Sequence, residues 1–256
     1  MLIFTLAHDV LGKSFCDIMS KIKIMYRIGN TTLQINTRRI RDVLCDWADE
    51  QIFLGDPESW DAAAADIPFP SHLRSVRFWI DSSDVPIERQ KGRGPSSAYW
   101  SGKMGRPARR YMFLLDGDQV ISKMWGGYSA KLYDGHFVES HKQWFDKKLS
   151  DVAVIGDTHF HSVRRELRKC QIIAPRPTPA TTNQETGQDE ERLTAAQQKK
   201  NAEIRRIRAR CEQPFSYIKS QMQILKRPWA EDLHELDSVI TIGSAIHNCK
   251  KRAKAS

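Results

Sequence analysis

Residues 108–127 read ARRYMFLLDGDQVISKMWGG, and this stretch decides the class of fold. Aromatic, β-branched and other apolar residues fill both of its halves, a composition typical of strands. Asp116, Gly117 and Asp118 stand between the halves and are common turn residues. The stretch therefore predicts two antiparallel strands joined by a hairpin.

Strand and helix patterns alternate on both sides of this hairpin. Upstream, SVRFWID (75–81) is rich in strand-forming residues and predicts a strand. Downstream, helical periodicity at 137–149 and 161–169 alternates with short apolar strands at 151–157 and 170–175. The order strand, hairpin, helix, strand, helix, strand predicts a mixed α/β sheet rather than a sandwich or a helical bundle.

The N-terminal region is predicted to be helical. Apolar residues recur at helical spacing over 12–28 and 38–53, with Gly29 as a turn residue between them. Thr32 or Asn36 is the candidate N-cap of the second helix. The pattern is compatible with a helix-turn-helix, but an ordinary helical hairpin with a solvated basic face is the simpler interpretation.

The C-terminal region is predicted to be helical as well. Residues 193–225 form one long helical pattern that Pro214 should kink or divide, and a final helix is expected over about 232–249. Residues 176–192 are rich in Pro, Thr and acidic residues without periodicity, which predicts a flexible insertion. The expected organisation is a helical segment at 1–73, an α/β domain at 74–250 and a basic tail at 251–256.

Charge and composition restrict the function classes. The chain of 256 residues has a net charge of +9, and its charge is uneven: 7 Lys+Arg face 10 Asp+Glu in 1–70, but 13 face 6 in 199–256. This excess predicts a polyanionic partner, most simply nucleic acid, although a merely soluble basic surface is the alternative. No apolar run approaches the roughly 20 residues of a membrane span, so no membrane association is expected.

Sequence motifs exclude several other classes. The 5 cysteines include no C-x-x-C pair, which argues against a disulfide framework or a cysteine zinc site and predicts a reducing compartment. The chain has no P-loop, GxGxxG or GxSxG pattern, which leaves a generic α/β protein with a small-molecule site as a minor alternative.

Three carboxylates stand where an α/β sheet places its chemistry, and a fourth acid lies on a helix. Asp81 ends the strand VRFWI, Asp157 ends VAVIG, and Asp134 lies in a loop after the hairpin. Each alone could be a turn aspartate or a helix cap. Glu212, on the long C-terminal helix, could simply pair with Arg208 one turn earlier. Together, two aspartates and a glutamate would suit hard cations such as Mg²⁺ in phosphodiester cleavage.

A set of motifs from Trp79 to Asn248 supports this interpretation. These motifs are WIDSSDVPI (79–87), YWSGKMG (99–105), RRYMFLLDGDQVI (109–121), WGGYSAKLYDG (125–135), VIGDTHF (154–160), IIAP (172–175), N-x6-R-x3-E-x2-F-x3-K (201–219) and IHN (246–248). In order and spacing the chain resembles the DDE superfamily endonuclease domain of PIF/Harbinger-type transposases, particularly fungal copies.

The resemblance implies a fold, a site and a cofactor. It implies an RNase H-like mixed sheet flanked by helices and a catalytic metal triad formed by Asp81, Asp134 and Glu212, with Asp157 as an accessory acid. The expected cofactor is Mg²⁺ or Mn²⁺, with two ions. Asp81 stands here in Asp-Ser-Ser rather than the usual Asp-Gly-Thr, and the loop before Asp134 also departs from the family pattern.

The resemblance further implies DNA as the substrate. The residues expected to contact DNA are Arg205, Arg208, Arg210 and Lys219. A homo-oligomer and an accessory DNA-binding protein are candidate partners, and the basic end KKRAKAS (250–256) favours a nuclear or nucleo-cytoplasmic location. The region before Trp79 is short for such a transposase, so the alternative function is that of an inactive or domesticated relic that binds DNA or a partner protein.

Overall fold

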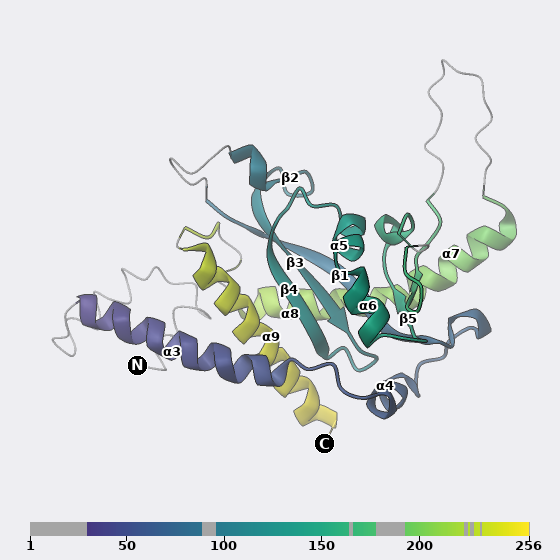
Figure 1. Cartoon of the computed structure of the whole chain (residues 1–256), viewed down its shortest axis with the longest axis horizontal. Coiled ribbons are helices and arrows are strands. Elements are labelled where there is room, and N and C mark those ends of the chain that lie inside the picture. The colour runs from purple at the N-terminus through teal and green to yellow at the C-terminus, as the bar shows by residue number, and fades with distance from the viewer. Residues whose placement is uncertain are drawn as a thin grey trace, which may run out of the picture.

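A computed structural model of the chain describes residues 30–88, 96–163, 166–177, 193–222, 225, 228–230 and 232–255 (Figure 1). The helix expected at 12–28 therefore lies outside the described residues, as does nearly all of the insertion expected at 176–192. None of the helices among the described residues is long and apolar enough to cross a membrane.

A mixed sheet forms the centre of the fold. Its strands are β1 (Val76–Pro86), β2 (Trp100–Ser101), β3 (Arg106–Leu115), β4 (Ile121–Ser129), β5 (Ala153–Ile155) and β6 (Gln171–Ile173). They lie in the order β2-β3-β1-β5-β6, and β4 also pairs with β3. The pairs β1–β3 and β3–β4 are antiparallel, whereas β5 runs parallel to both β1 and β6.

Helices flank this sheet. They are α3 (Asn30–Gln51), α4 (Pro57–Ala64), α5 (Asp134–Ser140), α6 (Lys142–Lys148), α7 (Ala195–Arg208), α8 (Glu212–Gln221) and α9 (Leu233–Ala255). Figure 1 shows α8 behind the sheet and α5 and α6 in front of it. The mixed sheet with helices on both faces is that of an RNase H-like nuclease fold, as the sequence predicts.

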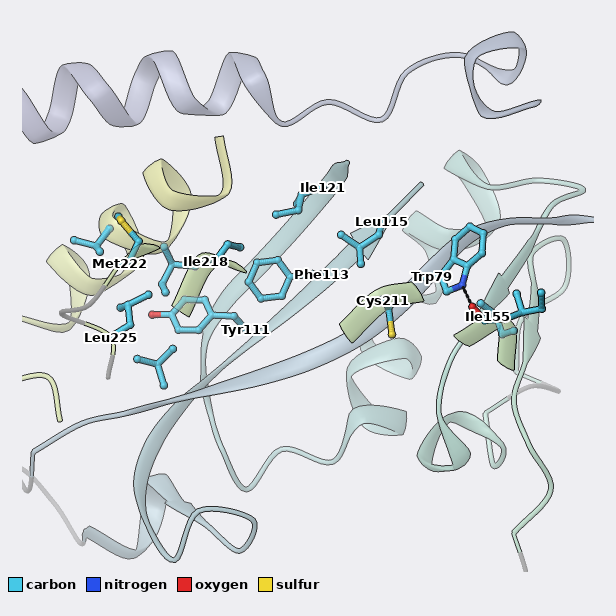
Figure 2. Close-up of a cluster of buried hydrophobic side chains, with 14 of the residues drawn as sticks. Trp79, Tyr111, Phe113, Leu115, Ile121, Ile155, Cys211, Ile218, Met222 and Leu225 are labelled. Atoms are coloured by element: carbon cyan, nitrogen blue, oxygen red, sulfur yellow. Dashed lines mark hydrogen bonds between the residues drawn. The ribbon is translucent and has the colours of Figure 1, made fainter. Parts of the chain in front are cut away.

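Alternate side chains of β1 enter two hydrophobic cores, one on each face of the sheet. Trp79 belongs to the core beneath α7, α8 and α9, which Figure 2 shows in close-up. Its neighbours Phe78 and Ile80 belong to the other core, together with Phe137 of α5 and Phe145 of α6. Because successive strand residues point to opposite faces, β1 offers odd-numbered side chains to α8 and even-numbered ones to α5 from Phe78 onward, after a register shift at Val76.

The hairpin between β3 and β4 forms as predicted. The Asp116 carboxylate accepts hydrogen bonds from the backbone N–H groups of Asp118 (3.0 Å) and Val120 (2.9 Å), which replace ladder partners inside the turn. Gly117 is required by close packing, because a Cβ atom there would lie 2.0 Å from the carbonyl oxygen of Ala63.

The long C-terminal helical pattern is divided, as Pro214 predicts. Between α7 and α8 the chain forms a single 3₁₀ turn at Ala209–Cys211. A proline ring excludes the carbonyl of the residue four positions earlier, here Arg210, so a continuous α-helix cannot pass through this point. The Nε1–H group of Trp79 donates a hydrogen bond to the Ile207 carbonyl (2.8 Å), which fixes the end of α7 on β1.

Both terminal helices differ from their predicted bounds. Helix α3 is already helical at Asn30, so Thr32 and Asn36 are interior residues and not its caps. It packs along α9, where Arg41 is buried and donates a hydrogen bond to Glu235 (3.0 Å). Helix α9 continues to Ala255, so the basic end of the chain is helical where a tail was expected.

Two other predicted helices are also changed. The helix expected at 137–149 is two helices, α5 and α6, with a break at His141. The helix expected at 161–169 is absent from the described part of that segment, which contains turns and bends. There the Asp146 carboxylate accepts hydrogen bonds from the backbone N–H groups of Arg168, Lys169 and Cys170, which holds them in a non-helical turn.

The ends of the described chain are tied to the hairpin by Asn248 of α9. Its Oδ1 atom accepts a hydrogen bond from the Ile121 N–H (2.7 Å), and its Nδ2 group donates to the carbonyls of Ile121 (2.8 Å) and Gln51 (3.0 Å). One buried amide thus joins α9, the start of β4 and the end of α3.

Candidate active site

Asp81 lies in the middle of β1, on the face that points toward α7 and α8, so the expectation that it ends the strand is wrong: pairing with β3 continues the strand to Pro86. Its side chain is 18% exposed. One oxygen accepts a hydrogen bond from the Ser82 N–H (2.8 Å) and the other from the Cys211 thiol (3.5 Å). Burial raises the pKa of Asp81 to about 6, against the lowering effect of the Ser82 hydrogen bond.

The 3₁₀ turn between α7 and α8 brings its flanking residues to Asp81. The Arg208 guanidinium lies 3.6 Å from the Asp81 carboxylate, and Cys211 donates to the same oxygen. Helix α8 begins at the next residue, Glu212, so its main chain starts beside Asp81. The side chain of Glu212 lies outside the described part of the structure.

Asp157 is placed beside Asp81 by strand register. Ile155 of β5 pairs with Trp79 of the parallel strand β1, and each aspartate follows two residues later along its own chain. Asp157 caps a short 3₁₀ helix through a hydrogen bond from the His159 N–H (2.8 Å). Its negative charge contributes to the raised pKa of Asp81 and of Asp134, so it lies near both.

Asp134 reaches this region from the other face of the sheet. It is the first residue of α5, and one of its oxygens accepts a hydrogen bond from Ser82 Oγ (3.0 Å). The other oxygen pairs with Arg110 (3.0 Å), whose guanidinium also makes a two-atom contact with the buried Asp84 (2.7 and 3.1 Å). Burial raises the pKa of Asp134, while Arg110 and Ser82 lower it.

Asp81 and Asp134, the two aspartates predicted as ligands, therefore belong to opposite faces of the sheet. Ser82, Asp84 and Arg110 belong to the α5 face of the sheet, whereas Asp81 belongs to the α8 face. Both oxygens of Asp134 are already bonded to residues of the α5 face. Asp157 follows the end of a strand and stands between these two environments.

The basic residues predicted to contact DNA take different positions. Arg208 lies at Asp81, and the Lys219 ammonium donates a hydrogen bond to the Asp84 carbonyl (3.2 Å), where burial and Lys103 lower its pKa. Arg210 instead contacts the hairpin carbonyl of Gly117 (3.0 Å), and Arg205 is exposed on α7. Arg208 and Lys219 thus lie near the carboxylates.

Three further residues of the site were not predicted from the sequence. Cys211 looks like an ordinary apolar residue of the long helix, and only the turn before Pro214 presents its thiol to Asp81. Ser82 and Arg110 share a strand face with Asp134, which strand alternation in WIDSSD and RRYMF would have indicated.

The carboxylates suit a hard divalent cation in chemistry, although they do not form a closed set of ligands. Among the described residues, no group of three or more His, Cys, Asp or Glu side chains is arranged to hold a metal ion. Asp81 is nevertheless a largely buried carboxylate with Asp157 close by, and a cation would relieve both its desolvation and this repulsion.

The mixed sheet is that of an RNase H-like nuclease fold, with Asp81 and Asp157 at two adjacent parallel strands. The sequence model of the DDE superfamily endonucleases matches residues 80–248, a range that contains all four predicted acids. The chain belongs to this family. Comparison with curated proteins and with solved structures gave no match.

Proposed function

We propose that the protein is a divalent-metal-dependent DNA endonuclease and strand transferase of the transposase type, related to the PIF/Harbinger elements of fungi. The observation that supports this most directly is the register of β1 and β5, in which Asp81 and Asp157 follow a paired position by the same number of residues. Mg²⁺ is usually held by one or two carboxylates together with waters and phosphate oxygens, which two neighbouring carboxylates would provide for.

The proposed ligands are Asp81, Asp157 and Glu212, with Asp134 as the competing assignment for the second aspartate. Geometry favours Asp157, because it follows the strand that pairs with the strand of Asp81, whereas Asp134 is paired with Arg110 at 3.0 Å on the α5 face. A bound Mg²⁺ or Mn²⁺ ion, of which we propose two, would supply an activated water and stabilise charge on the leaving oxygen.

The chain itself contributes charge and position. Asp81 must lose its proton to bind a cation, and the Arg208 guanidinium at 3.6 Å favours that ionised form. With a cation present, Arg208 beside Asp81 and Lys219 at the Asp84 carbonyl would hold a phosphate of the DNA backbone. A nuclear location, self-association and an accessory DNA-binding protein belong to the same proposal.

The test compares single variants in two assays. Mn²⁺ binding is followed by calorimetry, and nicking of plasmid DNA is followed with Mg²⁺ or Mn²⁺. Asp81→Asn, Asp157→Asn and Glu212→Gln should each lose both activities, whereas Asp134→Asn should keep Mn²⁺ binding. Asp151→Asn is the matched control, because Asp151 is exposed and its carboxylate accepts a hydrogen bond from the neighbouring Ser150 hydroxyl.

The outcomes separate the two assignments. Loss of Mn²⁺ binding in Asp134→Asn with retention in Asp157→Asn would restore Asp134 as the ligand. Retention of Mn²⁺ binding in Asp81→Asn would refute the proposed metal site.

A second candidate function is a DNA-binding protein without turnover. It is favoured by the Arg110 ion pair, which neutralises Asp134 without a metal. Steady DNA binding with no metal-dependent nicking by folded wild-type protein would select this candidate.

A further inference from the structure

A surface hollow lies between α8 and the last turns of α9. Its volume is about 230 Å³, and it is lined by Tyr217, His247, Lys250, Lys251 and Lys254. Tyr217 and Lys219 stand two residues apart on α8 and so point to nearly opposite sides of that helix. Since Lys219 reaches β1, the hollow lies on a different side of α8 from the carboxylates.

Positive charge is concentrated around this hollow. The Lys250 ammonium sits 4.7 Å from the centre of the Tyr217 ring, and Lys251 donates a hydrogen bond to the Gln119 side chain (2.6 Å). Burial lowers the pKa of Lys251, and the nearby charges of Lys254 and Arg210 lower it further. These cations therefore repel one another, and a bound anion would relieve the repulsion.

Acidic residues offset only part of this charge. Asp116 and Asp118 of the hairpin raise the pKa of Lys251, so they lie close to one side of the hollow. Lysines at a helix C-terminus also interact favourably with the helix dipole, but that dipole is equivalent to only about half of a negative charge. The positive charge around the hollow exceeds the negative charge of the two aspartates and the helix dipole together.

The floor of the hollow is aromatic and uncharged. The Tyr217 and His247 rings lie 5.2 Å apart, and burial lowers the pKa of His247. The neutral imidazole donates its Nε2–H to the Gln119 carbonyl (2.9 Å). A cationic rim over a neutral floor excludes a metal ion and suits a phosphate group.

We propose that this hollow binds the phosphate backbone of DNA at a second place, apart from the carboxylate site. The inference rests on the proposed function for its choice of DNA among polyanions. The 3₁₀ turn at Ala209–Cys211 links the two places, because Arg208 stands at Asp81 and Arg210 contacts the hairpin beside Lys251. DNA engaged at both places would contact the protein on two sides of this turn.

The test measures binding of a fluorescent DNA duplex by anisotropy, in EDTA and over a series of salt concentrations. The variant is Lys250→Gln/Lys254→Gln, which removes two exposed ammonium groups and leaves Lys251 in place. Each lost phosphate contact lowers the salt slope by about 0.9 and the affinity at 0.1 M salt by about 8-fold. The double variant should therefore lose about 1.8 in slope and up to about 60-fold in affinity.

Two control variants accompany this measurement. Lys147→Gln/Lys148→Gln makes the same charge change in the last turn of α6, where both lysines are exposed, and should leave the slope unchanged. Lys250→Arg/Lys254→Arg keeps the charge and should keep the wild-type slope. Equal slopes for the two glutamine variants, or no DNA binding by the wild type, would overturn the inference.

Plasmid nicking with Mn²⁺, run in parallel, separates this inference from the proposed function. If the protein nicks plasmid DNA and both glutamine variants have the same salt slope, the inference that the hollow binds DNA is wrong, while the proposed endonuclease activity stands. If the protein does not nick plasmid DNA but the salt slope falls only in Lys250→Gln/Lys254→Gln, the hollow binds DNA and the proposed endonuclease activity is wrong.

Discussion

Replacing Arg110 by methionine should destabilise the protein through the carboxylates that the guanidinium now neutralises. Arg110 bonds Asp84 at 2.7 and 3.1 Å, Asp134 at 3.0 Å and the Leu132 carbonyl at 2.7 Å. The Asp84 and Asp134 side chains are only 3% and 8% exposed. Methionine fills a similar volume but leaves both carboxylates buried without their cation.

The expected loss is that of breaking a buried ion pair, about 3–5 kcal/mol. For a chain of this size, 1 kcal/mol corresponds to about 2–4 °C in Tm, so the Tm at pH 7.5 should fall by about 6–20 °C. Without Arg110 the pKa of Asp134 rises further above its unfolded value. An acid of that kind destabilises the fold when ionised, so the deficit should shrink as the pH falls toward 5.

Thermal unfolding followed by circular dichroism at both pH values measures this effect. Arg106→Met is the control, because Arg106 lies on the same strand but is exposed, and its Tm should change little. A fall in Tm for Arg110→Met that is below about 2 °C, or that is equal at pH 7.5 and pH 5, would refute the reasoning.

Three further substitutions test other parts of the fold by thermal unfolding. Gly117→Ala should lower stability by about 1–3 kcal/mol, because its Cβ would collide with the Ala63 carbonyl; an unchanged Tm would contradict the packing of the hairpin on α4. Asp116→Asn should stabilise the protein above pH 6 and lose that advantage below about pH 4, since burial raises the pKa of Asp116 to about 6; a benefit independent of pH would count against burial as its cause. Trp79→Phe should cost about 0.5–1.5 kcal/mol by removing one of two donors to the Ile207 carbonyl, which also accepts from the Ala209 N–H, and a neutral effect would show that the bond contributes nothing.

The sheet could be predicted from the sequence because its signals are local. The hairpin turn at Asp116 and the division at Pro214 depend on residues within a few positions of one another. The helix expected at 161–169 was wrong because its competitor, the Asp146 carboxylate, stands about 20 residues earlier in the chain. The hydrogen bonds that the Asp146 carboxylate accepts from the backbone depend on tertiary packing, which cannot be inferred from the periodicity of the sequence.

For the candidate site, the sequence indicated which acids lie at the sheet but not which face each of them occupies. Asp81 and Asp157 follow runs of apolar strand residues in the sequence, so their place at the sheet could be inferred, although β1 continues past Asp81. Whether Asp134 or Asp157 stands with Asp81 depends on which face each residue occupies, and a family pattern alone carries no such information. The parity of β1 places Asp81 on the α8 face, and only the contacts with Ser82 and Arg110 in the structure place Asp134 on the α5 face.

The pairing of α3 with α9 has a consequence for synthesis of the chain. Gln51 and Asn248, which bond each other, are separated by 197 positions, and Arg41 finds Glu235 at a separation of 194. On the ribosome, α3 emerges early but has its partner only when nearly all of the remaining chain has followed. We therefore expect the helix to wait with its packing face uncovered until translation is almost complete, and a nascent chain stalled before α9 to need chaperone protection.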